Sequence, residues 1–273
     1  MPRQLPFFKA YPLTAKAAVH TPLVFRAGLE SLANLPWPSL EGIRDFAHFA
    51  GIGDGALRTA LSRARSEASL LVEEDSEGRK RYLIDPATFE MGAAQIRSDR
   101  RPEGFLLAVF SFKSEENEGR SALRALLKGF GFRKLAQNTY IQGRIGTEGL
   151  RAAVRSLGLE AHFFLFTCPD IEDAGLVARI FELFDFKGRS RELRDYLVRL
   201  KAFLPEGLAG DELARRLLYV GPVSWELVEA REPPFPASYL PADYALAEIH
   251  RFYDQRAADG GAALLSYYES VNR

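Results

Sequence analysis

The segment from Gly53 to Ile84 places the strongest constraint on how this chain folds. Its first half repeats apolar and small side chains at the spacing that puts them on one side of a helix. These residues are Leu57, Ala60, Leu61 and Ala64. We therefore expect an amphipathic helix here, with Asp54 as the N-cap whose side chain accepts the first free amide hydrogens.

The other side of this expected helix is rich in hydrogen-bond donors. It carries Arg58, Thr59, Ser62, Arg63 and Arg65. No acidic residue lies between Asp54 and Glu67. Such side chains bind phosphates and base edges, and an α-helix fits the major groove of DNA. We expect the first four of these residues to contact bases and Arg65 to hold a phosphate.

The second half of the segment predicts a β-hairpin. The apolar run Leu70–Val72 leads into the turn sequence DSEG, and the chain returns through Arg79, Lys80 and Arg81. We expect these three cations to contact the DNA backbone. A helix followed by a basic two-stranded ribbon is the arrangement of a winged helix-turn-helix. Proteins that never bind DNA also contain a helix with exposed arginines before a hairpin, so the preceding segments matter.

The residues before this segment predict two further helices. Residues 1–20 resemble an irregular arm, and Pro22–Asn34 is expected to form the first helix with Thr21 as its N-cap. Ser39 is expected to cap the second helix, and Gly51–Gly53 makes a short turn into the third. This order predicts a winged helix-turn-helix domain over residues 21–98.

Residues 103–169 predict a second domain. A buried strand is expected at Phe105–Phe112, and a helix striped by leucines follows it. Two short strands near residues 132–135 and 139–142, a helix after Thr147 and a last strand in LEAHFFLFTC complete the pattern. The order β-α-β-β-α-β is that of a ferredoxin-like unit.

Residues 170–273 are expected to form a mainly helical C-terminal domain for effector binding and dimerisation. A proline-rich loop, REPPFPASYLPADY, interrupts it, and the last helical stretch is expected to break at Gly260-Gly261. The fold class predicted for the whole chain is α+β and multidomain.

Composition narrows the classes of function. The 273 residues carry 36 basic and 36 acidic side chains, so net charge gives no general affinity for nucleic acid. The single cysteine, Cys168, excludes a disulfide framework and a cysteine-based zinc site. We see neither a signal peptide nor an apolar run of the roughly 18 residues that a membrane span needs. A cytoplasmic location is therefore expected.

Several stretches resemble one family of bacterial transcriptional regulators. They are ALRTALSRARSE, EGRKRYLI, GFLLAVFSF, LAQNTYI and YLPADY, in that order along the chain. The chain resembles the phenylacetic-acid catabolon repressors, the PaaX-like family. The resemblance implies a cytoplasmic homodimer that binds double-stranded operator DNA, represses genes of aromatic-acid catabolism, and is released by an acyl-CoA such as phenylacetyl-CoA.

The chain departs from the family pattern at three places. Ala68-Ser69 replaces a Gly-Trp turn, Tyr244 replaces the tryptophan of LPADW, and Ala64 replaces a leucine. An acyl-CoA effector would need cations beside an apolar slot. Our candidate cations are Arg189, Arg191, Arg194 and Arg199, and our candidate lining residues are Phe184, Phe186 and Trp225. The alternative for each arginine is a solvated ion pair, for example with Glu192 or Asp195.

Two other classes of function remain as alternatives. A metal-dependent nuclease on the middle domain would need a carboxylate at the end of the first strand, where this chain has Ser111. An adaptor would use the winged domain to bind protein. We expect no catalytic residues, no metal and no cofactor, and therefore no enzyme.

Overall fold

The computed structural model describes residues 5–86, 89, 104–143, 146–233 and 235–272. It mixes helices with two small sheets, as expected for an α+β chain. The chain divides into two compact units. The first contains Met1–Arg97, Leu193–Arg231 and Ala245–Arg273, and the second contains Ser98–Glu192 and Glu232–Tyr244. Residues 170–273, expected as one helical domain, are instead shared between the units, and the boundary expected at residues 98–103 lies outside the described residues.

The N-terminal residues of the first unit are helical. Helix α1 spans Pro6–Ala10 and α2 spans Ala15–Gly28, so the expected irregular arm over residues 1–20 is wrong for the described part. The Thr14 hydroxyl caps α2 by accepting the Ala17 amide hydrogen at 3.1 Å. Pro22 lies inside α2, where its buried carbonyl accepts the Tyr268 hydroxyl. The N-cap is therefore Thr14 and not Thr21.

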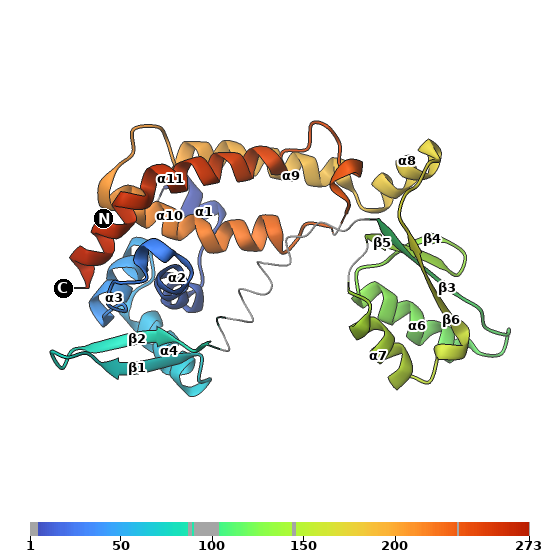
Figure 1. Cartoon of the computed structure of the whole chain (residues 1–273), viewed down its shortest axis with the longest axis horizontal. Helices are drawn as coiled ribbons and strands as arrows, with labels where there is room; N and C mark the ends of the chain where they lie inside the picture. The colour runs from blue at the N-terminus through green and yellow to red at the C-terminus, as the bar shows by residue number, and fades with distance from the viewer. Residues whose placement is uncertain (1–4, 87–88, 90–103, 144–145, 234, 273) are drawn as a thin grey trace. The chain divides into compact units, whose positions relative to one another are not determined.

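The next elements follow the expected order (Figure 1). After the 3₁₀ turn Glu30–Leu32 come α3 at Leu40–Phe49, α4 at Asp54–Ser66, and a hairpin of β1 at Leu70–Glu74 and β2 at Lys80–Ile84. Ser39 caps α3, as expected, by accepting the Gly42 amide hydrogen at 3.1 Å. The N-cap of α4 is Gly53 and not Asp54, which is the first helical residue.

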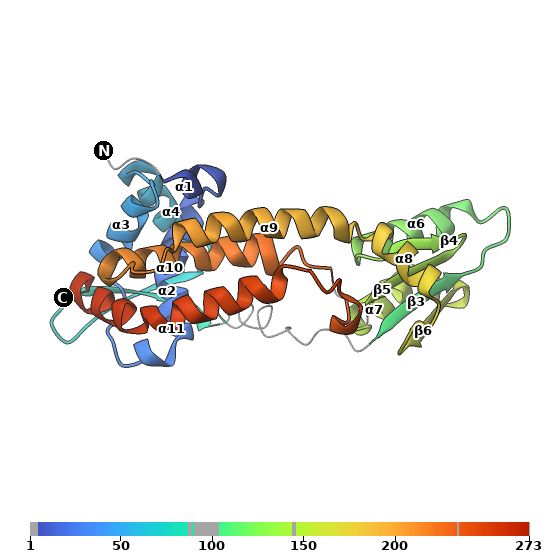
Figure 2. The same cartoon turned by 90° about the horizontal axis from the view of Figure 1, so that it is seen from above.

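Three later segments complete the first unit. They are the part of α9 (Phe186–Phe203) from Leu193 on, α10 at Gly210–Ser224 with the π-helical turn Trp225–Glu229, and α11 at Leu246–Val271. Figures 1 and 2 show α10 and α11 lying side by side. Helix α11 continues through Gly260-Gly261, so the expected break there is wrong. Gly260 is buried against α10, and a side chain on it would collide with Leu217.

Helices α10 and α11 are bonded to the N-terminal helices. The Asp45 carboxylate of α3 accepts hydrogen bonds from the Arg215 guanidinium at 2.9 Å and from the Tyr267 hydroxyl at 2.7 Å. The Asn272 side-chain oxygen accepts the Ser39 amide hydrogen at 2.9 Å. The C-terminal end of the chain is thus part of the structure that supports α3 and α4.

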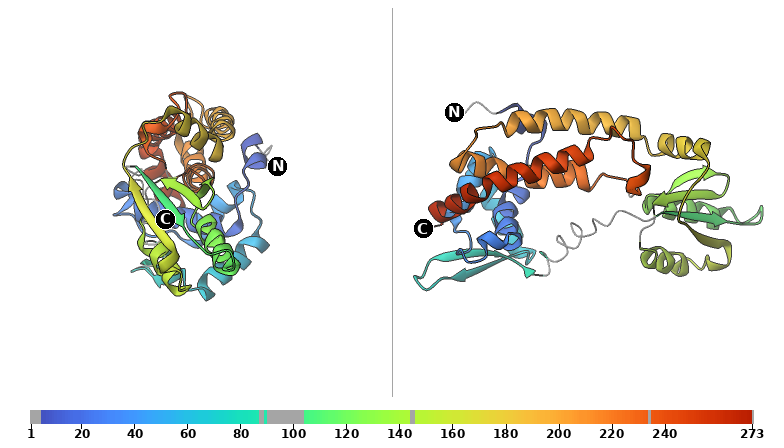
Figure 3. Two further views of the ribbon diagram at one scale, coloured as in Figure 1. Left: turned by 90° about the vertical axis from the view of Figure 1, so that its right-hand side faces the viewer. Right: turned by 45° about the horizontal axis from the view of Figure 1, so that its top comes forward.

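The second unit is built on one antiparallel sheet. The elements are β3 (Phe105–Phe110), α6 (Asn117–Gly129), β4 (Arg133–Ala136), β5 (Thr139–Gly143), α7 (Glu148–Ser156) and β6 (Phe163–Cys168). The strand order is β4-β5-β3-β6, and every neighbouring pair is antiparallel. Helices α6 and α7 cover one face of the sheet (Figure 3). The core between them contains Leu106, Ala108, Phe110, Leu123, Leu127, Phe132, Tyr140, Leu150 and Val154.

The proline-rich loop closes the second unit. Phe235 from this loop packs edge-on against Phe105, Phe184 and Phe186, with ring centroids 4.8 to 5.1 Å apart. Phe184 follows α8 (Ala174–Leu183), and Phe186 begins α9. The described part of this loop is therefore held in place by aromatic packing.

The two adjacent glycines of α11 should respond in opposite ways to substitution. Gly261→Ala has open space around its new methyl group and should stabilise the helix by about 1 kcal/mol. Gly260→Ala gains the same helical preference but must displace the buried Leu217, which costs about 1–3 kcal/mol. Urea unfolding should place Gly261→Ala above Gly260→Ala in stability. Equal stabilities would mean that the close contact between α10 and α11 is absent.

Candidate nucleic-acid interface

Helix α4 is oriented as its sequence predicts. Leu57 and Ala64 are each 2% exposed and Leu61 is 8% exposed, so the apolar side faces the interior. All five predicted α4 contact residues are exposed: Arg58, Thr59, Ser62, Arg63 and Arg65. The burial of three apolar side chains at helical spacing therefore fixes which side chains point outward.

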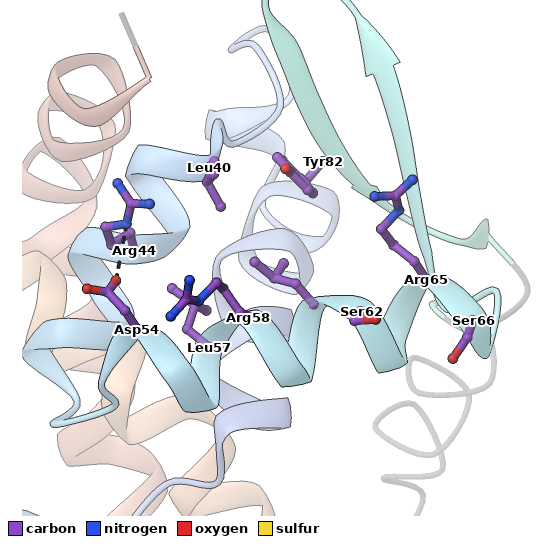
Figure 4. A pocket seen from close by; sticks show the side chains of 10 residues that line it. Leu40, Arg44, Asp54, Leu57, Arg58, Ser62, Arg65, Ser66 and Tyr82 are labelled. Carbon is purple, nitrogen blue, oxygen red and sulfur yellow. Dashed lines mark ion pairs between the residues drawn. The ribbon is translucent and has the colours of Figure 1, made fainter.

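A hollow with a volume of about 810 Å³ runs along α4. Arg58, Ser62 and Arg65 come from α4, and Leu40, Arg44 and Tyr82 come from α3 and β2 across the hollow (Figure 4). The three α4 residues are spaced i, i+4 and i+7, which places them on one side of the helix. The structure thus brings three of the five predicted α4 residues together with three residues that were not predicted.

The other two predicted α4 residues do not line this hollow. The Thr59 hydroxyl donates to the Gly55 carbonyl at 3.0 Å, so its hydrogen is used within the helix. The hydrogen bond from Lys16 lowers the pKa of the Glu67 carboxyl, and the nearby positive charge of Arg63 lowers it further. Both Thr59 and Arg63 are exposed, but they lie outside the hollow that Arg58 and Arg65 line.

Some charged side chains around the hollow form ion pairs, and others do not. The Asp54 carboxylate lies 3.4 Å from Nε of Arg44 and 3.1 Å from Nε2 of His48. The side chains of Arg58 and Arg65 form no ion pair or hydrogen bond with any residue that the structure describes. Two exposed guanidinium groups therefore face the hollow with their positive charge not neutralised.

The hairpin presents only part of the predicted basic set. Lys80 is exposed and has no partner among the described residues. Arg79 is exposed, and its guanidinium lies 3.1 Å from Asp75 and 2.8 Å from Glu77. Arg81 is 4% exposed, lies 2.8 Å from the Asp75 carboxylate and donates to the Asn272 carbonyl at 2.7 Å. The prediction that Arg81 holds a phosphate is therefore wrong, because strand alternation turns its side chain inward.

Asp75 organises the turn of the hairpin. Burial raises the pKa of its carboxyl group, but hydrogen bonds from the Arg79 and Glu77 amides and from the Arg81 and Arg79 guanidinium groups outweigh this effect. The net result is a pKa far below the usual range. The carboxylate thus stays charged and fixes Arg81 beneath the hairpin.

Sequence analysis missed Leu40, Arg44 and Tyr82. Tyr82 follows the inward Arg81 on β2, so alternation alone places it on the other face of the hairpin. Arg44 follows Ile43 in the apolar stripe of α3, a position that marks it as exposed but gives no sign of which neighbour it faces. These residues meet only because of the angle at which α3 packs on α4. That angle cannot be derived from the periodicity of the sequence.

The candidate effector residues are divided between the two units. Arg189 is 8% exposed, and its guanidinium lies 2.7 Å from Glu192 and 3.4 Å from Glu232. Phe184 and Phe186 pack against Phe235, which fills the slot that they were expected to line. Arg189 and Arg191 belong to the second unit, whereas Arg194, Arg199 and Trp225 belong to the first. Arg189 is therefore ion-paired with Glu192, as in the alternative, but its side chain is buried and not solvated.

Two further properties concern metal binding and membrane spanning in the described residues. They contain no group of three His, Cys, Asp or Glu side chains placed to hold a metal ion. Among the helices in the described ranges, none combines the length and the apolar character that crossing a membrane requires.

Comparison with known proteins shows similarity of fold alone. No family model matches the chain, and no curated protein matches its sequence. A solved structure with a similar fold is that of the uncharacterized protein Rv0674 from Mycobacterium tuberculosis, with a TM-score of 0.57 and 18% sequence identity. The match covers 95% of this chain and 99% of that chain.

Replacing Asp75 with asparagine should destabilise the protein in a pH-dependent manner. The folded state holds the pKa of Asp75 below its unfolded value of about 3.9, so this contribution to stability is fully present above that pH and is lost as the pH falls. We expect Asp75→Asn to lower the urea midpoint at pH 7, and the difference from the unsubstituted protein to shrink below about pH 4. Glu77→Gln, at an exposed position of the same turn, is the matched control and should change the midpoint little.

Proposed function

We propose that this protein is a transcriptional regulator that binds double-stranded DNA through a winged helix-turn-helix. The observation that carries the proposal is the exposed side of α4, where Arg58 and Arg65 face a hollow beside the hairpin without an acidic partner among the described residues. In this arrangement α3 and α4 form the helix-turn-helix, α4 enters the major groove, and β1–β2 is the wing.

The positions of the cations suggest separate roles. Arg58 lies in the second turn of α4, close to the helix N-terminus from which base edges are reached. An arginine that forms two hydrogen bonds to guanine contributes about 1–3 kcal/mol of discrimination against the wrong base. Arg65 at the other end of α4 and Lys80 beside the turn of the wing suit phosphate contacts, which set the position on DNA but do not read sequence.

The resemblance to the PaaX-like family extends the proposal to a repressor. It agrees with the strand order β4-β5-β3-β6, the order of a ferredoxin-like unit, in the second unit. On this proposal the protein is a cytoplasmic homodimer that represses a catabolic operon and is released by an acyl-CoA. Release requires the effector to bind the DNA-incompetent state more tightly than the DNA-binding state.

Arg58→Ala and Lys80→Ala should affect DNA binding in different ways. Arg58→Ala should reduce the preference for the operator over random duplex by about 10- to 100-fold, because it removes base contacts. Lys80→Ala should weaken both duplexes alike and reduce the slope of log affinity against log salt by about one. Fluorescence anisotropy over a range of salt concentrations measures both effects.

Arg199→Ala is the control for that experiment. Arg199 is an exposed arginine of α9 that has no partner among the described residues and does not line the hollow. Its substitution should leave the affinity and the salt slope unchanged. Equal losses of DNA affinity for Arg199→Ala and Arg58→Ala would show that α4 is not the contact surface.

The dimer should bind two half-sites on one face of the duplex. Their centres should be separated by about 10 base pairs or a multiple of this number. Inserting about 5 base pairs between the half-sites turns them to opposite faces and should abolish tight binding, whereas inserting about 10 should restore it. Gel-shift titration of the three duplexes measures this, and indifference to the spacing would contradict a dimer that binds both half-sites at once.

A further inference from the structure

A second hollow, with a volume of about 370 Å³, lies along α6, β4 and β5 of the second unit. Its lining includes Arg124, Lys128, Arg133 and Lys134, with Phe132 and Tyr140. None of the residues that line it is acidic. The charged side chains that line this hollow are thus all positive, although the chain as a whole has no net charge.

Three of these cations are not neutralised by the protein. Arg124, Lys128 and Lys134 are exposed, and their side chains form no ion pair or hydrogen bond with any residue in the described ranges. Arg124 and Lys128 are spaced i and i+4 on α6, where two like charges destabilise a helix. Arg133 differs, because its guanidinium lies over the Phe184 ring at 5.7 Å. An anion bound among the other three would remove their mutual repulsion.

Tyr140 supplies a further polar group to the hollow. It is 8% exposed, packs in the core formed with α6, and lies opposite Lys134 in the pairing of β4 with β5. Tyr140 lines the hollow, and its hydroxyl group has no hydrogen-bond partner among the described residues. The hydroxyl oxygen itself is accessible to solvent, so it can be reached from the hollow. A ligand oxygen in the hollow would accept this hydrogen.

We propose that this hollow binds a small phosphorylated ligand with two adjacent phosphate groups. Arg124, Lys128 and Lys134 bind the phosphate oxygens, and the Tyr140 hydroxyl donates one further hydrogen bond. The volume lies at the lower end of the range for small-molecule sites, about 300–1,000 Å³. The site belongs to the second unit, so the proposal does not rest on the DNA contacts assigned to α4.

Isothermal titration calorimetry of the full chain with inorganic pyrophosphate, and separately with adenosine diphosphate, tests the proposal at low salt. We expect dissociation constants of about 100 µM or tighter for at least one of the two. Similar values would show that the diphosphate alone is recognised, and tighter binding of adenosine diphosphate would show that the nucleoside contributes. Binding of neither probe would overturn the proposal.

Variants test which residues hold the ligand. Arg124→Gln and Lys128→Gln should each weaken binding about tenfold or more, and Tyr140→Phe, which removes only the hydroxyl group, should weaken it about tenfold. Arg151→Gln is the matched control, because Arg151 is an exposed cation of α7 that does not line the hollow. A loss with Arg151→Gln as large as that with Lys128→Gln would overturn the proposal in favour of non-specific charge attraction.

Measurements of DNA binding distinguish this site from the proposed DNA interface. Arg58→Ala should leave the pyrophosphate affinity unchanged even if DNA binding fails, and Lys128→Gln should leave the affinity for duplex DNA unchanged. If Lys128→Gln weakens DNA binding and pyrophosphate does not bind, the hollow is a DNA contact and the small-ligand proposal is wrong.

Discussion

The candidate interface depends on one buried junction between three distant parts of the chain. The Arg81 guanidinium lies between the Asp75 carboxylate and the Asn272 carbonyl, and the Asn272 side chain accepts the Ser39 amide hydrogen. Ser39 in turn caps α3 and forms an isolated β-bridge with Arg81. The hairpin, the start of α3 and the end of α11 are therefore fixed at one place. Removing one partner of a buried charged group leaves the other unsatisfied, so the junction holds only as a whole.

This junction explains why the first unit is built from distant segments. A three-helix group with a hairpin has little core of its own, and small domains bury a smaller share of their surface. Here α10 and α11 add a long apolar contact, and the hydroxyl groups of Tyr267 and Tyr268 bond to Asp45 and to the Pro22 carbonyl. The orientation of α4 relative to the hairpin thus depends on the last residues of the chain as much as on the segment that forms it.

Local patterns predicted the elements of this structure well, but not the contacts between them. The side of α4 that is buried, the cap at Ser39 and the order of strands and helices in the second unit follow from periodicity and capping chemistry. The errors at Pro22, Gly260 and Arg81 share one cause, which is tertiary packing. Pro22 is tolerated inside α2 at a buried position, Gly260 serves a close helix contact, and Arg81 is neutralised by Asp75 and a carbonyl from the other end of the chain. Local sequence patterns cannot predict these partners, because the partners lie about 40 to 250 residues away or depend on a carboxylate in a turn.

The free positive charge on α4 follows from where the neighbouring acids are committed. Asp54 is held by Arg44 and His48, Glu67 by Lys16, and Asp75 by Arg79 and Arg81. These three carboxylates each already have a cation, so none of them neutralises Arg58 or Arg65. Exposed ion pairs contribute little to stability. Their effect here is to neutralise the acidic side chains and to leave the two arginines of α4 without an acidic partner. A chain with no net charge can therefore present a local positive surface.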